Sequence, residues 1–340
     1  MRKSVLIALI LVMALVCVTI VASGCSNASR TLDMRYLTPE EEPPAPVFHW
    51  PLTSEETTSE VGFDLRPISI KISNAPEVDP QTGLIDADIV YEFEAEGGIS
   101  RFNAVFQSKL PPMVGSVRSA RLTDIWVCEQ WNSYLVTSGM SDSVRSALRN
   151  AGLDVLTEER NEMWERVRGV PAPHDLFVNL TEVPRIAAAQ SIETTWTPRS
   201  IEFDIDPSFD ATPTATHVTV PIGPAQKSVW EWNVIAQRYL RSQKDKPHVD
   251  AVTGEQIDAA NVIVMWADTT KFELGGAVSV FKGGVRYDGT WTTPQGSPPV
   301  IVDANGMPIL LNPGKTWFQI VKPSAEITVV GVTDTLPATE

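Results

Sequence analysis

The spacing of apolar residues changes near residue 200, and this change limits the folds open to the chain more than any other feature. Before this point, runs with helical spacing alternate with runs of two-residue period, whereas from about Thr214 onward nearly every run has the two-residue period of a strand. A run can bury one face of an element only when its period matches that element. The sequence therefore predicts an α+β protein, with an N-terminal α/β layered domain followed by an all-β sandwich or open barrel domain.

The first folded domain is predicted over residues 63–195 and contains both kinds of element. Its strands are expected at 66–73, 87–96, 100–108 and 133–139. Its helices are expected at 118–131, 143–152 and 181–190. Gly97 and Gly98 are typical of the turn between the second and third strands, and Ser141 is placed to cap the second helix. This alternation predicts helices packed on a sheet.

The second folded domain is predicted over residues 214–332 and consists of short alternating runs separated by Gly, Pro and Asn-Gly turn signals. No sequence repeat points to a propeller. The proline-rich stretch 196–213 is expected to be the linker between the two domains, and residues 333–340 a tail.

The beginning of the chain has the features of a lipoprotein signal. Arg2 and Lys3 precede a long apolar run, and Val-Ala-Ser-Gly stands directly before Cys25. This order predicts a signal peptide over residues 1–24, after whose removal Cys25 carries a lipid such as palmitate. The alternative is an uncleaved membrane anchor, because about 18 to 20 apolar residues can span a bilayer. Both interpretations place the remaining chain on the extracytoplasmic face of the cell membrane.

Residues 25–62 are rich in Pro, Glu, Thr and Ser, and this composition predicts a disordered acidic tether. The apolar segment 48–53 within it is a candidate for docking on the folded part. Because Cys17 lies in the signal peptide and Cys25 would carry lipid, Cys128 is the one thiol left in the mature chain. A single thiol makes no internal disulfide, so stability must come from packing.

The overall charge and the absent motifs exclude several classes of protein. The formal charge is −15 at pH 7, and such a surface repels nucleic acid, which is therefore not an expected partner. The chain has no Walker loop and no GxGxxG, HExxH, CxxC or GxSxG motif. None of its four histidines lies within four residues of another, so neither a metal site nor a cofactor is expected.

Three glutamates form the first half of a candidate site. Residues 89–98 read IVYEFEAEGG, in which Glu92, Glu94 and Glu96 alternate with apolar residues and so share one face of a strand. This face could be wet surface, half of an ion-pair network or the edge of a site. A glycosidase pair has little support, because two side chains on one strand face cannot lie on opposite sides of a scissile bond.

Two arginines form the second half. Arg118 and Arg121 are three apart on an expected helix, so they share a face near a helix start that also bears Ser119. Such a pair can hold a carboxylate or phosphate in a bidentate fork. The structural alternative is that Glu92 and Glu96 simply neutralise the two arginines.

His174 lies in a proline-flanked loop, VPAPHDLFVN. It is a candidate general base or hydrogen-bond donor to a ligand, and equally a candidate brace for its loop. We predict that Arg118, Arg121, Glu92, Glu96 and His174 converge where helix and sheet meet in the first domain, since faces that carry opposite charges satisfy each other only by contact.

The order of several segments resembles that of a known family. The segments are RPISIKISN, PQTGLIDADIVYE, EGGISRF, VGSVRSAR, PAPHDLF, HVDAVTGEQ, NVIVM, GTW and LNPGKTWFQIV. In this order they resemble the YerB-like lipoprotein family, whose two halves are domains of unknown function, over residues 62–322. The resemblance implies motif positions at Asn74, Gln81, Asp88, Glu92, Glu96, Gly97, Gly98, Arg101, Arg118, Ser119, Arg121, His174, His248, Asp250, Trp291, Asn312, Gly314 and Trp317. Glu94 departs from the family, which usually has an uncharged residue there.

These observations lead to two expectations about function. The first is a membrane-anchored extracytoplasmic lipoprotein that binds a cell-wall fragment or an envelope protein. The alternative is an envelope hydrolase that acts on cell-wall material with a Glu/Arg/His cluster, although no recognised catalytic motif supports it. The candidate binding residues are Arg118, Arg121, Glu92, Glu96, His174, Ser119 and Arg101.

Overall fold

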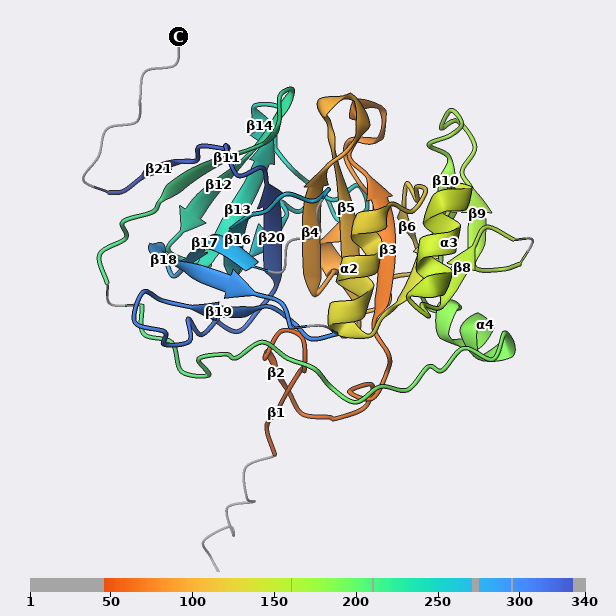
Figure 1. The fold of residues 1–340 in the computed structure, drawn as a ribbon, viewed down its shortest axis with the longest axis horizontal. Coiled ribbons are helices and arrows are strands. Elements are labelled where there is room, and N and C mark those ends of the chain that lie inside the picture. Colours follow the sequence, from red (N-terminus) through yellow and green to blue (C-terminus); the bar gives the residue numbers. More distant parts are fainter. Residues whose placement is uncertain (1–45, 160, 210, 271–274, 295, 333–340) are drawn as a thin grey trace, which may run out of the picture. The chain divides into compact units, whose positions relative to one another are not determined.

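The computed structural model of the chain describes residues 46–332, apart from residues 160, 210, 271–274 and 295 (Figure 1). The expected signal peptide, Cys25 and the first part of the expected tether lie outside these residues. The described residues belong to one compact unit that begins at Pro46. Most of its regular structure is strand.

A ten-stranded sheet passes through both halves of the chain. Its strands, in order across the sheet, are β19 (Val300–Val302), β18 (Val285–Thr292), β17 (Gly275–Lys282), β16 (Asn261–Trp266), β20 (Thr316–Val321), β4 (Ile89–Glu94), β5 (Ser100–Phe106), β3 (Ile68–Ser73), β7 (Tyr134–Thr137) and β8 (Val155–Thr157). Strand β20 pairs in parallel with β16 on one side and with β4 on the other. The two sequence halves are therefore joined by main-chain hydrogen bonds in the middle of one sheet.

This shared sheet differs from the expectation that each half builds its own. The stretch 196–213, expected as a linker, is partly packed on the fold. Trp196 is buried and donates its backbone N–H to the carbonyl of Asp64 at 2.7 Å, and Phe203 forms a β-bridge with Leu311. Periodicity reveals which face of a strand is apolar but not which strand lies beside it, so the pairing of β20 with β4 was not visible in the sequence.

Three smaller sheets complete the strand structure. A six-stranded sheet contains β14 (Lys246–Pro247), β13 (Arg238–Gln243), β12 (Gln226–Asn233), β11 (His217–Gly223), β21 (Thr328–Val330) and β15 (Asp258–Ala259). A three-stranded sheet contains β6 (Val114–Gly115), β10 (Leu176–Val178) and β9 (Trp164–Arg166), and a two-stranded one contains β1 (Phe48–His49) and β2 (Glu56–Thr57).

The six-stranded sheet packs against one face of the ten-stranded sheet. In β11, buried Val218, Val220 and Ile222 alternate with half-exposed residues, as the two-residue period predicts. These residues share a core cluster with Phe102 of β5 and Trp317 of β20. The apolar alternation of the second half thus becomes one wall of a core that also includes the first half.

Three α-helices occur among the described residues: α2 (Leu122–Trp131), α3 (Asp142–Asn150) and α4 (Val183–Ala189). Helix α2 lies on the other face of the ten-stranded sheet, where its Val127 and Trp131 pack with Tyr91 and Phe93 of β4 (Figure 1). Helix α3 packs beside α2. The molecule is therefore mostly β, with fewer helical residues than a fully layered first half would need. No helix in the described part combines the length and apolar character needed to cross a bilayer.

The helix starts show one success and one error of sequence reasoning. Ser141 caps α3, since its hydroxyl accepts the N–H of Val144 at 3.4 Å. Helix α2 begins at Leu122 rather than at 118, because Arg121 has an extended backbone and occupies the N-cap position. Its N–H donates to the carboxylate of Asp124 at 2.7 Å, which closes the first turn. Arg118 is therefore not on the helix.

The apolar segment 48–53 is part of the fold. Leu52 and Thr53 are buried, and the carbonyl of Thr53 accepts the N–H of Gly314 at 2.7 Å. Ordered structure thus begins earlier than residue 62, where the expected tether was to end, because this apolar segment contributes to the core beneath the sheet.

Candidate anion-binding site

A pocket of about 480 Å³ opens at one end of the ten-stranded sheet. Strands β4, β20 and β16 run in the same direction, and the residues after β16 and at the end of β4 line this pocket. The remaining walls come from the starts of β5, α2 and α3. In open sheets with parallel strands, ligands commonly bind beyond the carboxyl ends of the strands. We call this the arginine pocket, and its lining residues include Lys71, Phe93, Glu94, Glu96, Arg101, Arg121, Leu122, Thr123, Val144, Thr269 and Thr270.

Arg101 is the most unusual residue of the arginine pocket. It is 8% exposed, and its Nη2 lies 3.2 Å from the Oε2 of Glu96. Its Nε and Nη1 have no hydrogen-bond partner among the described residues. Burial lowers the pKa of Arg101, and the nearby positive charge of Arg121 lowers it further. A buried guanidinium with two unmatched donors is costly, so the positive charge of Arg101 is only partly matched by the residues around it.

Arg121 and Glu96 form the exposed side of the site. The Nε of Arg121 donates to the Oε1 of Glu96 at 2.6 Å, as the pairing predicted from the sequence requires. The Nη1 of Arg121 donates to the carbonyls of Ser119 and Ala120, which fixes the guanidinium against its own backbone. The hydrogen bond from Arg121 lowers the pKa of Glu96 to about 2, although the side chain of Glu96 is 63% exposed.

A buried ion pair forms the floor of the arginine pocket. The Nζ of Lys71 donates to the Oδ1 of Asp124 at 2.8 Å, and the Nδ2 of Asn103 donates to the same oxygen at 2.9 Å. The other oxygen of Asp124 accepts the backbone N–H of Arg121. Asp124 thus ties β3 and β5 to the first turn of α2 and holds Arg121 in place. This ion pair was not predicted from the sequence, where its signal was a single lysine inside the apolar strand ISIKIS.

Two helices start at this pocket. Leu122 and Thr123 begin α2, and Val144 lies in the first turn of α3. The first N–H groups of a helix lack intrahelical acceptors and carry a partial positive charge. Together with the three cations Lys71, Arg101 and Arg121 they make the pocket favourable for a negative group, in a chain that is acidic overall.

Arg118 and His174 lie at the edge of this arrangement. The Nη1 of Arg118 donates to the carbonyl of Pro173 at 2.9 Å, which connects Arg118 to the loop of His174. Burial lowers the pKa of Arg118, and Arg121 lowers it further, so the two cations lie close to each other. The backbone N–H of His174 donates to Pro171, whereas its buried Nδ1 has no partner among the described residues.

Ser119 has a local role in the structure. Its hydroxyl lies 3.4 Å from that of Ser138, and its carbonyl accepts from Arg121. The Ser119 side chain therefore joins the segment before α2 to the end of β7, and its carbonyl positions Arg121.

The prediction that Glu92 joins Arg118 and Arg121 is wrong. Glu92 is fully buried on the opposite face of β4 and forms an ion pair with Arg241, in which both carboxylate oxygens accept from the same Nη2, at 3.0 and 3.1 Å. Its carboxylate also accepts hydrogen bonds from Ser100, Trp317 and Gln319. The face shared by Glu92 and Glu94 is directed at the six-stranded sheet, and the chain turns after Ala95 so that Glu96 alone reaches the arginines.

Arg241 connects this ion pair to further buried polar groups. Its Nη1 donates to Gln243 and lies 2.6 Å from the Nδ1 of His248, whose other ring nitrogen contacts Gln81 at 2.5 Å. Burial and then the charge of Arg241 lower the pKa of His248 well below its usual value, so its ring stays neutral and accepts from Arg241. We call the network of Glu92, Arg241, His248, Gln81 and Gln243 the buried polar network.

Glu94, another of the three alternating glutamates, has a cation partner of its own. Its carboxylate lies 2.5 Å from the Nζ of Lys322, which follows β20. The pair links the ends of two neighbouring strands, so Glu94 is occupied by its own cation at the edge of the arginine pocket.

Nine of the positions that carry the family resemblance fall into two groups. Asn74, Gln81, Glu92, His248 and Trp317 belong to or contact the buried polar network between the two sheets. The other group surrounds the arginine pocket and contains Glu96, Arg101, Arg118 and Arg121. Among the described residues, no three His, Cys, Asp or Glu side chains gather in the way that a metal ion requires.

Comparison with known proteins identifies relatives along most of the chain. Residues 52–193 match the family described as "Protein of unknown function (DUF3048) N-terminal domain", and residues 218–318 match the corresponding C-terminal domain. A protein of Bacillus subtilis (strain 168) named "Putative lipoprotein YerB" is 27% identical over 288 residues, which cover 80% of this chain and 85% of that protein. The crystal structure of the YerB protein from Bacillus subtilis matches with a TM-score of 0.74 and 27% identity, over 83% of this chain and 99% of that chain.

Proposed function

This chain belongs to the YerB-like two-part family, and from that premise we propose that it is an extracytoplasmic lipoprotein that binds an anionic ligand in the arginine pocket. The observation that carries this proposal is Arg101, a buried cation whose Nε and Nη1 have no partner among the described residues. An anion in the arginine pocket gains attraction from the positive charges of Arg101 and Arg121, and only one of the three nitrogens of the Arg101 guanidinium, Nη2, already has a partner.

The location rests on the start of the chain. An apolar run that ends in Val-Ala-Ser-Gly before Cys25 supports cleavage and lipidation at Cys25, and a relative carries "lipoprotein" in its name. A lipid anchor would hold the arginine pocket in the envelope, where anionic wall polymers and peptide ends are abundant.

Binding is better supported than hydrolysis. A glycosidase needs one carboxyl group whose pKa is raised, so that it can protonate the leaving group at neutral pH. Glu96 has the opposite property, because the hydrogen bond from Arg121 lowers its pKa to about 2. Glu92, the other expected carboxylate, is buried in the buried polar network and does not line the arginine pocket.

The proposal is tested with the mature chain from residue 25, titrated with propionate and with inorganic phosphate by calorimetry at low ionic strength. We expect weak, salt-dependent binding of at least one of the two anions. Arg101→Met should weaken this binding at least tenfold, because it removes the central cation and corresponds to the loss of about one charge-assisted hydrogen bond. Arg145→Met is the matched control, since Arg145 is an exposed arginine of α3 that does not line the pocket.

The result can also contradict the proposal. If Arg101→Met binds as tightly as Arg145→Met, the arginine pocket is not the anion site. Because Arg101 is buried and its variant could fail to fold, Arg121→Gln provides a second test at a partly exposed position, with the same expected direction.

A further inference from the structure

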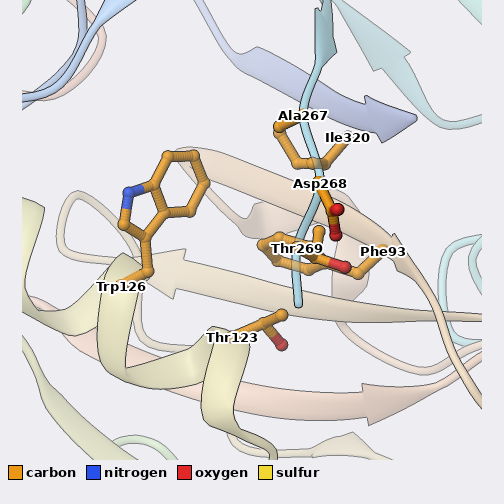
Figure 2. A pocket seen from close by; sticks show the side chains of 7 residues that line it. All are labelled: Phe93, Thr123, Trp126, Ala267, Asp268, Thr269 and Ile320. Atoms are coloured by element: carbon orange, nitrogen blue, oxygen red, sulfur yellow. The ribbon is translucent and has the colours of Figure 1, made fainter. Parts of the chain in front are cut away.

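An apolar recess adjoins the arginine pocket (Figure 2). Phe93, Trp126, Ala267 and Ile320 form its walls, and the recess shares Phe93, Thr123 and Thr269 with the arginine pocket. Its free volume is about 20 Å³. A space of this size holds a group as large as one water molecule or one methyl group. Figure 2 shows the indole nitrogen of Trp126 on the side of the ring away from the other labelled side chains, so the ring presents carbon to the recess.

The arginine pocket already contains a carboxylate, that of Glu96. One oxygen of Glu96 contacts the Nε of Arg121 at 2.6 Å and the other contacts the Nη2 of Arg101 at 3.2 Å. The two arginines are thus arranged around a planar group with two oxygens. Glu96 stands on an exposed turn that contains Gly97 and Gly98, both with left-handed backbones. Its carboxylate can leave for water without disturbing a core.

The ring of Phe93 lies between the arginine pocket and the apolar recess and lines both of them. Phe93 lies opposite Arg101 in the pairing of β4 with β5, and its ring is 5.5 Å from the Nζ of Lys71. A ligand whose carboxylate binds the two arginines therefore has to extend over the ring of Phe93 to reach the apolar recess. Most of the recess wall is apolar, formed by Phe93, Trp126, Ala267 and Ile320, so an apolar group is favoured at this end.

Building on the proposed function, we propose that the ligand is a short amphipathic carboxylate, of the kind found at a peptide C-terminus with a small apolar side chain. Its carboxylate takes the place of Glu96 between Arg101 and Arg121. Its apolar part covers Phe93 and ends in the recess. The small volume of the recess excludes a long acyl chain, and the planar carboxylate that the arginines already hold favours a carboxylate over a phosphate.

The test uses a series of unbranched carboxylates from acetate to octanoate, titrated into the mature chain. We expect the affinity to rise about fourfold for each added methylene, the effect of burying one such group, and then to stop rising once the recess is filled. Hexanamide, which has the same chain without the charge, should bind at least tenfold more weakly than hexanoate. Equal affinity across the series, or a rise that continues to octanoate, would overturn the proposal, the latter because it indicates a long-chain site.

Variants that fill the recess locate the apolar end. Ala267→Leu should remove the gain between butyrate and hexanoate while leaving acetate binding unchanged, whereas Ala304→Leu on an exposed loop should change neither. Thr269→Ile narrows the recess from its half-exposed rim. Because Thr269 also lines the arginine pocket, only the length dependence of this variant, and not its affinity for acetate, is the test if Ala267→Leu does not fold. An unchanged length dependence in both recess variants contradicts the assignment of the apolar end.

The role of Glu96 gives a test by gain of affinity. Glu96→Gln removes the negative charge that competes with the ligand, so the affinity for hexanoate should increase severalfold. A lower affinity for hexanoate would mean that Glu96 helps to bind the ligand. This result would overturn the proposal that the ligand displaces the carboxylate of Glu96. The two proposals fail differently: if no carboxylate or phosphate binds, the proposed function is wrong, whereas binding of acetate, hexanoate and phosphate with equal affinity contradicts only the further inference.

Discussion

Arg241 is the residue on which the contact between the two sheets depends most. It belongs to β13, is fully buried and pairs with Glu92 of β4, 149 residues away in the sequence. The rings of Phe102, Trp230 and Trp317 surround its guanidinium at 5.0 to 5.8 Å. In such an apolar environment the attraction between the two charges offsets the loss of their hydration. Removing one partner leaves the other charge buried and unpaired, which strongly destabilises the folded state.

We predict that Arg241→Met lowers the free energy of unfolding by about 3 to 5 kcal/mol, because it leaves the carboxylate of Glu92 buried without its cation. Urea denaturation followed by tryptophan fluorescence measures the change. Arg145→Met is the control, and removal of this exposed arginine should change stability by less than about 1 kcal/mol.

The double variant Arg241→Met/Glu92→Leu separates the ion pair from the packing. It should be more stable than Arg241→Met alone, because no unpaired charge remains in the core. If the double variant is instead destabilised by the sum of the two single effects, the two residues do not act as a pair.

Asp88 is a second buried carboxyl group, and its protonation affects the stability of the fold. It accepts hydrogen bonds from the backbone N–H groups of Gln107 and Ser108, and one from the Ser108 hydroxyl. Burial outweighs these bonds and raises the pKa of Asp88 to about 6. Asp88 lies just before β4, so its protonation state affects the start of the strand that joins the two halves.

The raised pKa of Asp88 predicts how the stability of the Asp88→Asn variant, relative to wild type, changes with pH. The folded state binds the proton more tightly than the unfolded state, so the contribution of Asp88 is fully present below the usual pKa of about 4 and is lost as pH rises to about 6. Relative to wild type, Asp88→Asn should gain about 2 kcal/mol of stability between pH 4 and pH 6.5, because a shift of one pKa unit corresponds to about 1.4 kcal/mol and the unfolded state is already partly ionised at pH 4.

Urea midpoints measured at half-unit steps of pH test this prediction for Asp88. Asp142→Asn is the control, since Asp142 is fully exposed and its variant should follow the wild-type curve. A constant difference between Asp88→Asn and wild type over this range would mean that the carboxyl of Asp88 titrates normally.

At the scale of elements, β20 decides whether the two halves are independent. All six of its residues are buried, and both of its edges are paired, with β16 and with β4. Removing the first half would expose one edge of β20 and the apolar face against which α2 packs. An open edge next to buried apolar residues favours aggregation over folding.

We predict that a fragment of residues 214–332 does not fold alone, although its strands form a continuous run in the sequence. It should lack a near-ultraviolet circular dichroism signal and a cooperative unfolding transition. Addition of a fragment of residues 46–213 should restore both, because it supplies β4 and the other side of the core.

The fragment of residues 46–213 alone is the matched control, and it should also remain unfolded because β4 then has an open edge. A fragment 214–332 with a sharp, reversible transition of its own would show that β4 is dispensable for the second half.

At the scale of the whole molecule, the described fold accounts for neither its location nor its anchor. The helices in the described part are too short to cross a bilayer, and Cys25 lies outside the described residues. The proposed lipid at Cys25 would therefore be the element that keeps the arginine pocket close to the membrane.

Cys25→Ala should move the protein from the membrane fraction to the soluble or secreted fraction, because lipidation requires the thiol at this position. Cell fractionation followed by immunoblotting measures the distribution. Cys17→Ala, which changes a cysteine inside the signal peptide, should leave the protein in the membrane fraction. If Cys25→Ala also remains there, the apolar run is itself the anchor.

The sequence by itself determined the features that depend on neighbours along the chain. The alternation in β11, the Ser141 cap of α3 and the glycine turn after β4 all follow from local sterics and hydrogen bonding, and all are present. The pairing of Glu96 with Arg121 was also within reach, because both residues lie in one compact stretch of the first half.

Only the tertiary structure decided what lies opposite each face. The charges at Glu92 and Glu94 gave no information on whether their partners come from the first half of the chain or from the second. Both partners come from the second half, Arg241 in β13 and Lys322 after β20. The physical reason is that burial obliges a charge to find a partner but does not specify its position in the chain. That choice is made when β20 pairs with β4 and brings the second half onto the first.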